Sequence, residues 1–419
     1  MAVNFRVSYL ILIAAAIVLP VNTSWGEDSK SRPDIGQIVS VISEAHIQAS
    51  LERLVGFGTR NTMSDPSHPE RGIGAARTWI FRELQSYSPR LQVRFSRWPI
   101  DQRTGLPVTE LYNVIAVLPG KTLPETRVVI SAHYDSAAGL DPEAPAPGAN
   151  DDGSGTAAVM ELARVLSRFE FDKTLVFMAF AGEEQGLIGS AQEAATAKRE
   201  SENIEAVLYN DIIGDDAPGP ELNKQTAVNV FAGKRGDSPS QELARFVHDI
   251  GRRYLPSLVV NAVSQADRIG RGGDHLSFQA QGFAAVRFTT PYEIVTNQHN
   301  IHDTLENMSV EYCTRVAKLN AAAAAALALA PKTPPAFTAM SRGENEVDLK
   351  WKPAGSGIAG YAIVIRAIDA PFWEQEIRVG KVGEYRLKDI SLDSVRLGLK
   401  ALGSDGYASL VTPAMVITR

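Results

Sequence analysis

The chain has 419 residues, of which 44% are hydrophobic and 21% charged, as expected for a globular protein of two or three domains. The formal net charge of −6 and the lack of a basic cluster argue against a nucleic-acid partner. The only cysteine is Cys313, which excludes an intrachain disulfide, so core burial and any bound metal must hold the protein together.

The first 26 residues differ from the rest of the chain. Arg6 precedes an apolar run over Val7–Val21, and the small residues Ser24 and Gly26 stand at −3 and −1 of a possible cleavage site. This pattern is typical of a secretory signal, so we predict a signal peptide over 1–26 and a secreted or periplasmic protein. An uncleaved membrane anchor is the alternative. The run is shorter than the roughly 20 residues of a spanning helix, which favours cleavage with no stable membrane insertion afterwards.

The next part of the chain alternates between helical and extended patterns. Apolar residues at helical spacing predict helices over 35–54, 73–84, 156–166, 187–197, 241–254 and 310–329. Short apolar or alternating runs predict strands over 91–98, 111–118, 128–130, 175–180, 206–213 and 284–288. Strands separated by helices predict an α/β fold with a mixed, mostly parallel sheet sandwiched by helices. We therefore predict a catalytic domain over 34–330.

A proline-rich linker over Pro331–Pro335 ends this domain. Residues 336–419 alternate in the manner of short antiparallel strands, which predicts a small all-β sandwich. Trp351 and Tyr361, on successive predicted strands, resemble a fibronectin type III module. Such a module could bind a surface, a partner or the catalytic domain, and its residues do not choose among these.

Polar and acidic residues collect where predicted strands end. His133 and Asp135 follow the run at 128–130, a glycine-bounded acidic loop contains Asp151, and Glu183 and Glu184 follow the run at 175–180. Open α/β sheets bind their ligands at this edge. Carboxylates together with imidazole suit a zinc-like ion, and no cysteine cluster is available to make a thiolate site.

Each of these residues also has a structural interpretation. Asp151 could cap the following helix, and the two glutamates could be solvated loop charges. His46, His68 and His248 lie away from acidic clusters, and we expect structural roles for them. Adjacent carboxylates at the end of a buried strand nevertheless repel one another unless a cation or a shared proton lies nearby.

Five motifs in fixed order make the combination specific. Over Ile35–Leu329 the sequence resembles the secreted co-catalytic zinc aminopeptidases, a family that also includes glutamate carboxypeptidases and glutaminyl cyclases. The motifs are HYD at His133, GANDDGSG at Gly148, AGEEQGLIGS at Ala181, NDIIG at Asn210 and HNIHDTLEN at His299.

The resemblance implies two zinc ions, and mixed oxygen and nitrogen ligands would also admit cobalt or manganese. It implies that Asp151 bridges the ions, that His133 and Asp211 complete one ligand set, and that Glu184 and His299 complete the other. Asp135 is implied as the partner that orients His133.

Glu183 is implied as the general base for a water shared by the two ions. His302 competes with His299, and His299 is preferred because the family's ligand precedes the aspartate at Asp303 by four residues. Asp274 and His275 resemble a family segment in which serine stands at Gly273, and we expect a structural or pocket-shaping role for them, not a ligand role. The resemblance also implies a cis peptide between Asp151 and Asp152.

The predicted activity is hydrolysis of N-terminal residues from peptides by an exported metallo-aminopeptidase. A carboxypeptidase or dipeptidase of the same family is the nearest rival, and it needs an arginine facing the substrate carboxylate, for which Arg268 and Arg271 are candidates. A glutaminyl cyclase is a further alternative. A binding protein with a decayed peptidase domain is the rival from another class, although the residues at all five ligand positions and at the base are intact.

Overall fold

The computed structural model describes residues 33–100, 109–216, 226–233, 238–265, 272–343, 345–355 and 357–417. Pro33–Arg419 forms one compact unit. The predicted signal peptide over 1–26, Arg268 and Arg271 lie outside the described residues. In the described part of the chain, none of the helices is both long enough and apolar enough to cross a membrane.

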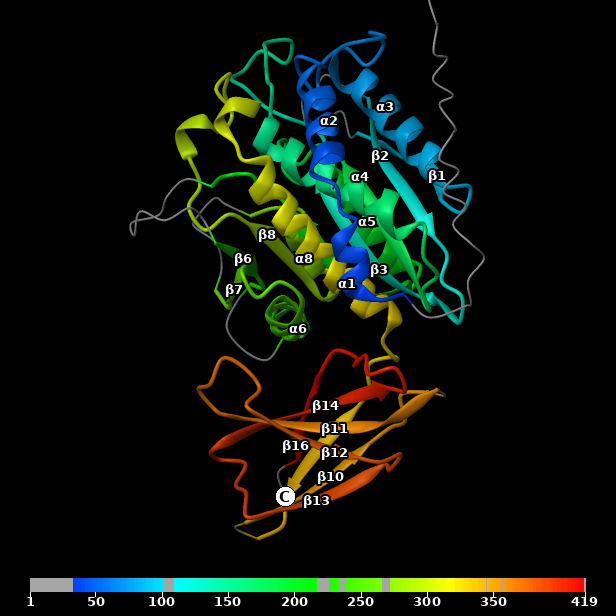
Figure 1. The fold of residues 1–419 in the computed structure, drawn as a ribbon, viewed down its shortest axis with the longest axis vertical. Coiled ribbons are helices and arrows are strands. Elements are labelled where there is room, and N and C mark those ends of the chain that lie inside the picture. The colour runs from blue at the N-terminus through cyan, green and yellow to red at the C-terminus, as the bar shows by residue number, and fades with distance from the viewer. Residues whose placement is uncertain are drawn as a thin grey trace, which may run out of the picture. The chain divides into compact units, whose positions relative to one another are not determined.

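An eight-stranded mixed sheet forms the centre of the larger part of the molecule (Figure 1). Its spatial order is β1-β2-β4-β3-β5-β8-β6-β7. The strands are β1 (Gln92–Pro99), β2 (Glu110–Leu118), β3 (Leu123–His133), β4 (Lys173–Phe180), β5 (Asn203–Asn210), β6 (Ala227–Phe231), β7 (Val259–Val263) and β8 (Ala285–Thr289). The central strands β4, β3, β5 and β8 are mutually parallel, whereas β1, β2 and β6 pair antiparallel with their neighbours on the inner side. The predicted mixed α/β sheet is confirmed, although β6 and β7 were not predicted.

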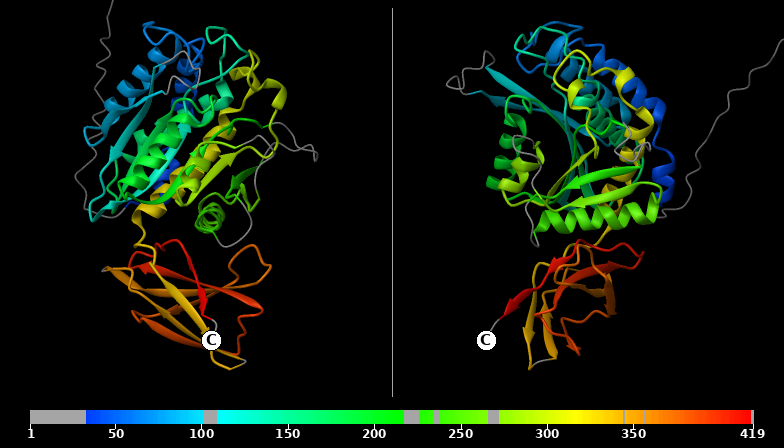
Figure 2. Two further views of the ribbon diagram at one scale, coloured as in Figure 1. Left: turned by 180° about the vertical axis from the view of Figure 1, so that it is seen from behind. Right: turned by 90° about the vertical axis from the view of Figure 1, so that its left-hand side faces the viewer.

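Helices cover both faces of this sheet (Figure 2). They are α1 (Ile35–Ser40), α2 (Glu44–Val55), α3 (Gly72–Tyr87), α4 (Gly155–Leu166), α5 (Ile188–Arg199), α6 (Pro239–Tyr254), α7 (His275–Ala280) and α8 (Val310–Leu329). The larger core lies on the side of α4 and α8, and a smaller core lies against α5 and α7. Helix α8 packs against α1, α2, α4 and α6, and its buried alanines let these helices approach closely.

The single helix predicted over 35–54 is wrong, because the chain forms α1 and α2 with a break between them. Ser43 ends the break by accepting a hydrogen bond from the His46 N–H as the cap of α2. The Ser43 N–H in turn donates to Glu161 Oε1 at 2.7 Å. Helical spacing of apolar residues continues across the break, so periodicity could not reveal it.

Two four-stranded sheets form the C-terminal part, in the orders β13-β10-β9-β16 and β12-β11-β14-β15. The strands are β9 (Phe337–Ser341), β10 (Glu346–Trp351), β11 (Ile358–Ala367), β12 (Gln375–Val379), β13 (Glu384–Lys388), β14 (Val395–Gly403), β15 (Thr412–Pro413) and β16 (Met415–Ile417). All pairs are antiparallel except β9 with β16, and residues of both sheets share one separate core. Trp351 and Tyr361 meet edge to face at 5.5 Å within that core. The fibronectin type III assignment itself stays a prediction.

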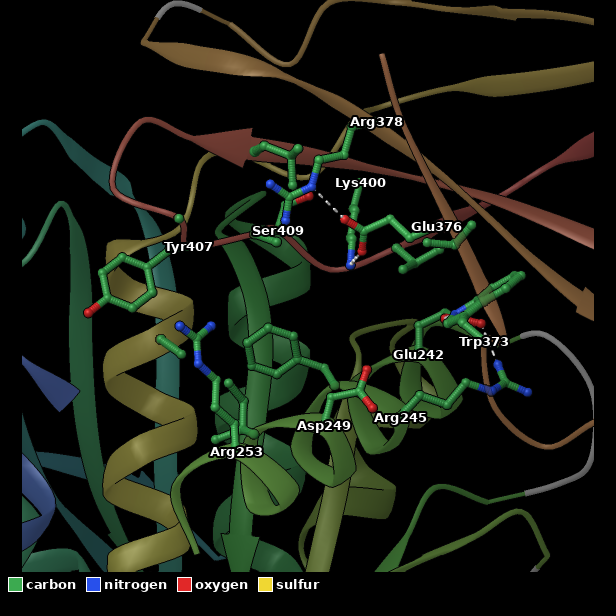
Figure 3. A pocket seen from close by; sticks show the side chains of 18 of the residues that line it. Glu242, Arg245, Asp249, Arg253, Trp373, Glu376, Arg378, Lys400, Tyr407 and Ser409 are labelled. Carbon is green, nitrogen blue, oxygen red and sulfur yellow. Dashed lines mark hydrogen bonds and ion pairs between the residues drawn. The ribbon is translucent and has the colours of Figure 1, made fainter. Parts of the chain in front are cut away.

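Helix α6 contacts the loop between β11 and β12. Trp373 Nε1 donates to Glu242 Oε2 at 2.9 Å, and Arg245 Nε donates to the Pro371 carbonyl at 2.7 Å. The ring of His248 stacks on Phe372 at 3.9 Å, in keeping with the structural role expected for this histidine. These contacts adjoin a cavity of about 330 Å³ (Figure 3).

A buried amide on β2 holds the segment that follows β4. Asn113 is fully buried, and its Oδ1 accepts the Ala181 N–H at 3.1 Å. Its Nδ2 donates to the Gly189 carbonyl and to Glu193 Oε1, both at 3.1 Å. The side chain therefore joins β2, the start of α5 and the loop that contains Glu183 and Glu184.

We expect Asn113→Ala to lower the free energy of unfolding by about 2–4 kcal/mol, because it leaves buried donors and acceptors without partners. Denaturant titration followed by circular dichroism measures this change. Asn261→Ala is the matched control, since Asn261 also bonds through its amide, to Asn229 Oδ1 at 3.1 Å, but at an exposed site. The control should change stability by less than about 0.5 kcal/mol. An equal loss in both variants would contradict the role given to Asn113.

Candidate metal centre

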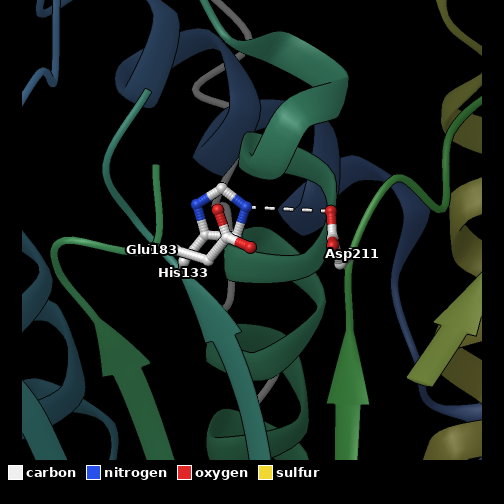
Figure 4. Close-up of side chains that lie close together, drawn as sticks. All are labelled: His133, Glu183 and Asp211. Carbon is white, nitrogen blue, oxygen red and sulfur yellow. Dashed lines mark ion pairs between the residues drawn. The ribbon is translucent and has the colours of Figure 1, made fainter. Parts of the chain in front are cut away.

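The carboxyl ends of three neighbouring parallel strands bring the predicted site residues together. His133 is the last residue of β3, Glu183 and Glu184 follow β4, and Asp211 follows β5 directly. Because β4, β3 and β5 lie side by side and run parallel, these side chains emerge at one edge of the sheet. Figure 4 shows Glu183 and Asp211 close to the imidazole of His133.

Asp151 lies between two imidazoles. Its Oδ1 is 3.3 Å from His133 Nε2, and its Oδ2 is 3.1 Å from His299 Nε2. His299 Nε2 also lies 3.2 Å from Glu184 Oε2, and His133 Nε2 lies 3.7 Å from Asp211 Oδ1. One oxygen of Asp151 thus faces His133, which lies near Asp211, and the other faces His299, which lies near Glu184. This arrangement is the one expected of a carboxylate that bridges two ions.

Two overlapping groups of donor atoms are close enough together to hold a cation. One comprises His133, Glu183 and Asp211, and the other His133, Asp151 and Glu184. His133 Nε2, Glu184 Oε1 and Asp211 Oδ1 are buried without a hydrogen-bond partner. Buried ring nitrogens and carboxylate oxygens without hydrogen-bond partners fit a divalent ion with mixed oxygen and nitrogen ligands, such as zinc.

Burial and mutual repulsion perturb the carboxyl groups of this cluster. Burial raises the pKa of Glu183 to about 8, and the charges of Asp211, Asp274 and Asp151 add to the effect. Burial and then the Asp151 charge raise the pKa of Glu184 well above its usual range. Cations at the site would offset this repulsion, whereas without them the Glu183 carboxyl group holds a proton at neutral pH.

Asp135 organises the loop that carries the two glutamates. Its Oδ1 is 3.4 Å from His133 Nδ1, the position expected of the partner that orients the imidazole. The N–H groups of Glu183 and Glu184 donate to its two oxygens at 3.4 and 3.3 Å. Thr62 Oγ1 donates to Asp135 Oδ2 at 3.0 Å and accepts the Gly182 N–H at 3.0 Å.

Asp303 and Arg60 hold the acidic loop, and sequence reasoning assigned neither of them this role. Asp303 accepts the N–H groups of Asn150 and Asp151 at 2.8 and 2.9 Å. Arg60, which has no exposed surface, donates to the carbonyls of Tyr134 at 2.8 Å, Leu54 at 3.2 Å, Pro147 at 2.7 Å and Gly148 at 2.8 Å. Arg60 lies in a loop rich in glycine and threonine, and nothing in that local sequence indicates that its side chain binds four backbone carbonyls.

The structure bears on the helix-cap alternative for Asp151 and on His302 as the rival of His299. The Gly155 N–H at the start of α4 donates to Asp152 Oδ1, so Asp152 satisfies the helix start and Asp151 does not. His302 is exposed, whereas His299 lies against Asp151 and Glu184. The peptide bond between Asp151 and Asp152 is cis, as predicted.

Gly273 lies beside Asp211, and the buried Asp274 follows it directly before α7. A Cβ on Gly273 would lie 2.5 Å from Tyr209 Cε1, which explains why glycine stands where the family has serine. Asp274 is buried, and burial raises its pKa to about 7. Neither Asp274 nor His275 belongs to the two donor groups found in the described part of the chain, in keeping with a pocket-shaping role.

A cavity of about 380 Å³ opens beside the donors. Apolar side chains of Leu187, Ile212 and Leu276 line it, together with Arg287. Leu187, Ile212 and His299 all have positive φ values, of 61°, 57° and 54°, although none is glycine. Such conformations are costly for branched side chains and cluster at functional sites.

Comparison with known proteins agrees with this geometry. The sequence model of peptidase family M28 matches residues 113–324. A probable zinc metalloprotease of Pyricularia oryzae is 38% identical over 422 aligned positions, which cover 90% of this chain and 84% of that protein.

The chain belongs to peptidase family M28. It is therefore a zinc metallopeptidase, a hydrolase that acts on peptides. The family assignment made from the five motifs is confirmed.

Solved structures share the fold of this M28 peptidase. The LapA aminopeptidase of Legionella pneumophila superimposes with a TM-score of 0.57 at 21% identity, covering 70% of this chain and 74% of that one. A glutaminyl cyclase of Porphyromonas gingivalis superimposes with a TM-score of 0.52 at 18% identity, covering 68% and 98%. At these identities the likeness concerns the fold alone.

The raised pKa of Glu183 gives a pH dependence for the metal-free protein. Between the usual pKa of 4.5 and about 8, the folded chain keeps a proton that the unfolded chain releases. Stability should therefore fall as the pH rises from 5 to 8, by up to about 1.4 kcal/mol per pH unit for this group.

Thermal unfolding of chelator-treated protein at several pH values tests this dependence. Glu183→Gln removes the titrating group, so the metal-free variant should show a shallower decline than the metal-free wild type. Zinc-loaded wild type should show no such decline over this range. A metal-free protein whose stability rises from pH 5 to 8 would contradict the assigned direction.

Proposed function

We propose that this M28 peptidase is an exported aminopeptidase with a two-zinc centre. The observation that carries the proposal is the position of Asp151, whose two oxygens lie 3.3 and 3.1 Å from the imidazoles of His133 and His299. His133 and Asp211 complete one ligand set, and Glu184 and His299 complete the other.

The zinc ions, when bound, would polarise the substrate carbonyl and acidify the attacking water. Glu183 accepts the proton of that water on its carboxylate and returns it to the leaving amine. Asp135 supports both steps, because it orients His133 and accepts the Glu183 N–H.

The cavity lining supports a substrate with an apolar side chain beside the scissile bond. Leu187, Ile212 and Leu276 supply apolar surface next to Asp151 and Glu184. A carboxypeptidase or dipeptidase would need an arginine free to face a carboxylate. The arginine that lines the described part of the cavity is Arg287. Its side chain instead contacts Asp211 and the Gly272 carbonyl.

The remaining parts of the proposal rest on the sequence. The apolar run over Val7–Val21 supports export with cleavage after Gly26, to a secreted or periplasmic location. The separate core of the β-sandwich over 336–419 supports a distinct module, which could bind a surface or a partner. The catalytic domain would then extend over 34–330.

We expect Glu183→Gln to lower kcat by a factor of about 10²–10⁴ and to keep the zinc content of the wild type, because it removes the base without removing a ligand of either proposed set. Steady-state kinetics and elemental analysis measure the two quantities. In the wild type, a chelator should abolish the activity and zinc should restore it. A variant with wild-type kcat would rule out Glu183 as the base, and a wild type without metal-dependent turnover would favour a binding protein.

Substrate panels should show release of N-terminal residues from free peptides, fastest for apolar residues, and no turnover of N-blocked peptides. The reason is that the cavity beside the candidate ligands has limited volume and presents the apolar side chains of Leu187, Ile212 and Leu276. Mass spectrometry of the products measures which bond is cut. Turnover of N-blocked peptides alone would favour the carboxypeptidase alternative. Cyclisation of N-terminal glutamine without peptide cleavage would favour the cyclase.

A further inference from the structure

Arg287 is a buried cation on the face of the sheet that carries the smaller apolar core. It lies in β8, opposite Tyr209 of β5 in the parallel register, and only 1% of its surface is exposed. Ala285, which shares its face of the strand, belongs to the smaller apolar core. A buried guanidinium keeps its charge and is costly unless paired, so its partners define its role.

Those partners lie at the metal centre. Arg287 Nε is 3.1 Å from Asp211 Oδ2, and its Nη1 donates to the Gly272 carbonyl at 2.8 Å. A Cβ on Gly273 would lie 3.2 Å from the same Oδ2, so this oxygen faces the segment at 272–273. The other oxygen, Oδ1, faces His133 and has no hydrogen-bond partner.

We propose that Arg287 is a positioning residue that makes Asp211 a one-oxygen ligand of reduced charge. The guanidinium lies in ion-pair contact with Oδ2, without hydrogen-bond geometry between Nε and that oxygen, and Oδ1 is the oxygen that faces His133 and the proposed cation. Its positive charge offsets that of the carboxylate, which keeps the ion beside His133 electron-poor and less tightly bound. This inference rests on the two-zinc function proposed above and concerns one of its two ligand sets.

The other ligand set has a different balance of charge. Glu184 and His299 contact each other, and His299 also contacts Asp151. In the described part of the chain, no arginine or lysine forms an ion pair with Glu184. His299 is also 49% exposed, whereas His133 is 1% exposed. The two ions therefore lie in unequal environments, and Arg287 weakens binding at the more buried one.

Metal affinity separates this role from a structural one. A residue that merely supports the fold should weaken metal binding when it is replaced. We expect Arg287→Met instead to tighten binding of one of the two ions by about tenfold or more, because a nearby positive charge and a competitor for Oδ2 are both removed. We also expect kcat to fall by at least about tenfold, since the ion becomes less electron-poor.

Arg287→Lys separates charge from geometry. Lysine keeps the positive charge, so the affinity for metal should stay within about threefold of the wild type. Lysine lacks the planar guanidinium, which contacts Asp211 and the Gly272 carbonyl at the same time. With cobalt as the probe, Asp211 should then bind through both oxygens, and the higher coordination number should reduce the visible absorption of that ion in both variants.

The experiment titrates metal-free full-length protein with Zn²⁺ and with Co²⁺ against a chromogenic chelator. Arg164→Met is the matched control, because Arg164 is another buried arginine that pairs with a carboxylate, Glu161, at 2.7 Å. This control should lose stability and keep wild-type metal affinities and cobalt absorption.

Weaker metal binding in Arg287→Met, or unchanged cobalt absorption in Arg287→Lys, would overturn the role of Arg287. Should Arg287→Met fail to fold, the lysine variant decides alone. A wild type that takes up no more than one ion contradicts the two-zinc function itself. If the wild type binds two ions but Arg287→Met does not bind metal more tightly, only the role of Arg287 is contradicted.

Discussion

Electrostatic repulsion among buried carboxylates is the constraint on which this structure depends. Asp151, Glu183, Glu184 and Asp211 converge on His133 at one edge of the sheet, where burial removes the water that would otherwise screen them. In the bare chain, burial and then this repulsion raise the pKa of both glutamates. Bound divalent cations would relieve it, which ties the stability of this edge to its metal content.

Buried positive and polar groups keep the acidic loops in place around the cluster. Arg60 gathers four backbone carbonyls beneath the loop of Asp151, while Asp135 and Asp303 accept backbone N–H groups of the loops that carry the candidate ligands. Loops at sheet edges are otherwise the mobile parts of a fold. Here the hydrogen bonds fix the loops that carry the candidate ligands, as a catalytic site requires.

The fold itself does not choose the reaction. Aminopeptidases and glutaminyl cyclases both superimpose on the catalytic part of this chain, at identities that show architecture alone. The features that bear on chemistry are local: a glutamate beside the donor set, an apolar cavity wall and an arginine bound to a carboxylate. From these features we propose peptide hydrolysis at a free N-terminus.

The sequence by itself determined the family, the mixed α/β class and the residues of the candidate centre, because short motifs at strand ends carry that information locally. It could not show the break between α1 and α2, the strands β6 and β7, or the roles of Arg60 and Arg287. Apolar periodicity runs through the break at Val41–Ser43, and each arginine acts on partners distant in sequence, such as Asp211 for Arg287. Only the tertiary structure decided which oxygen of each carboxylate faces the ion position, since that depends on contacts between strands and loops brought together by folding.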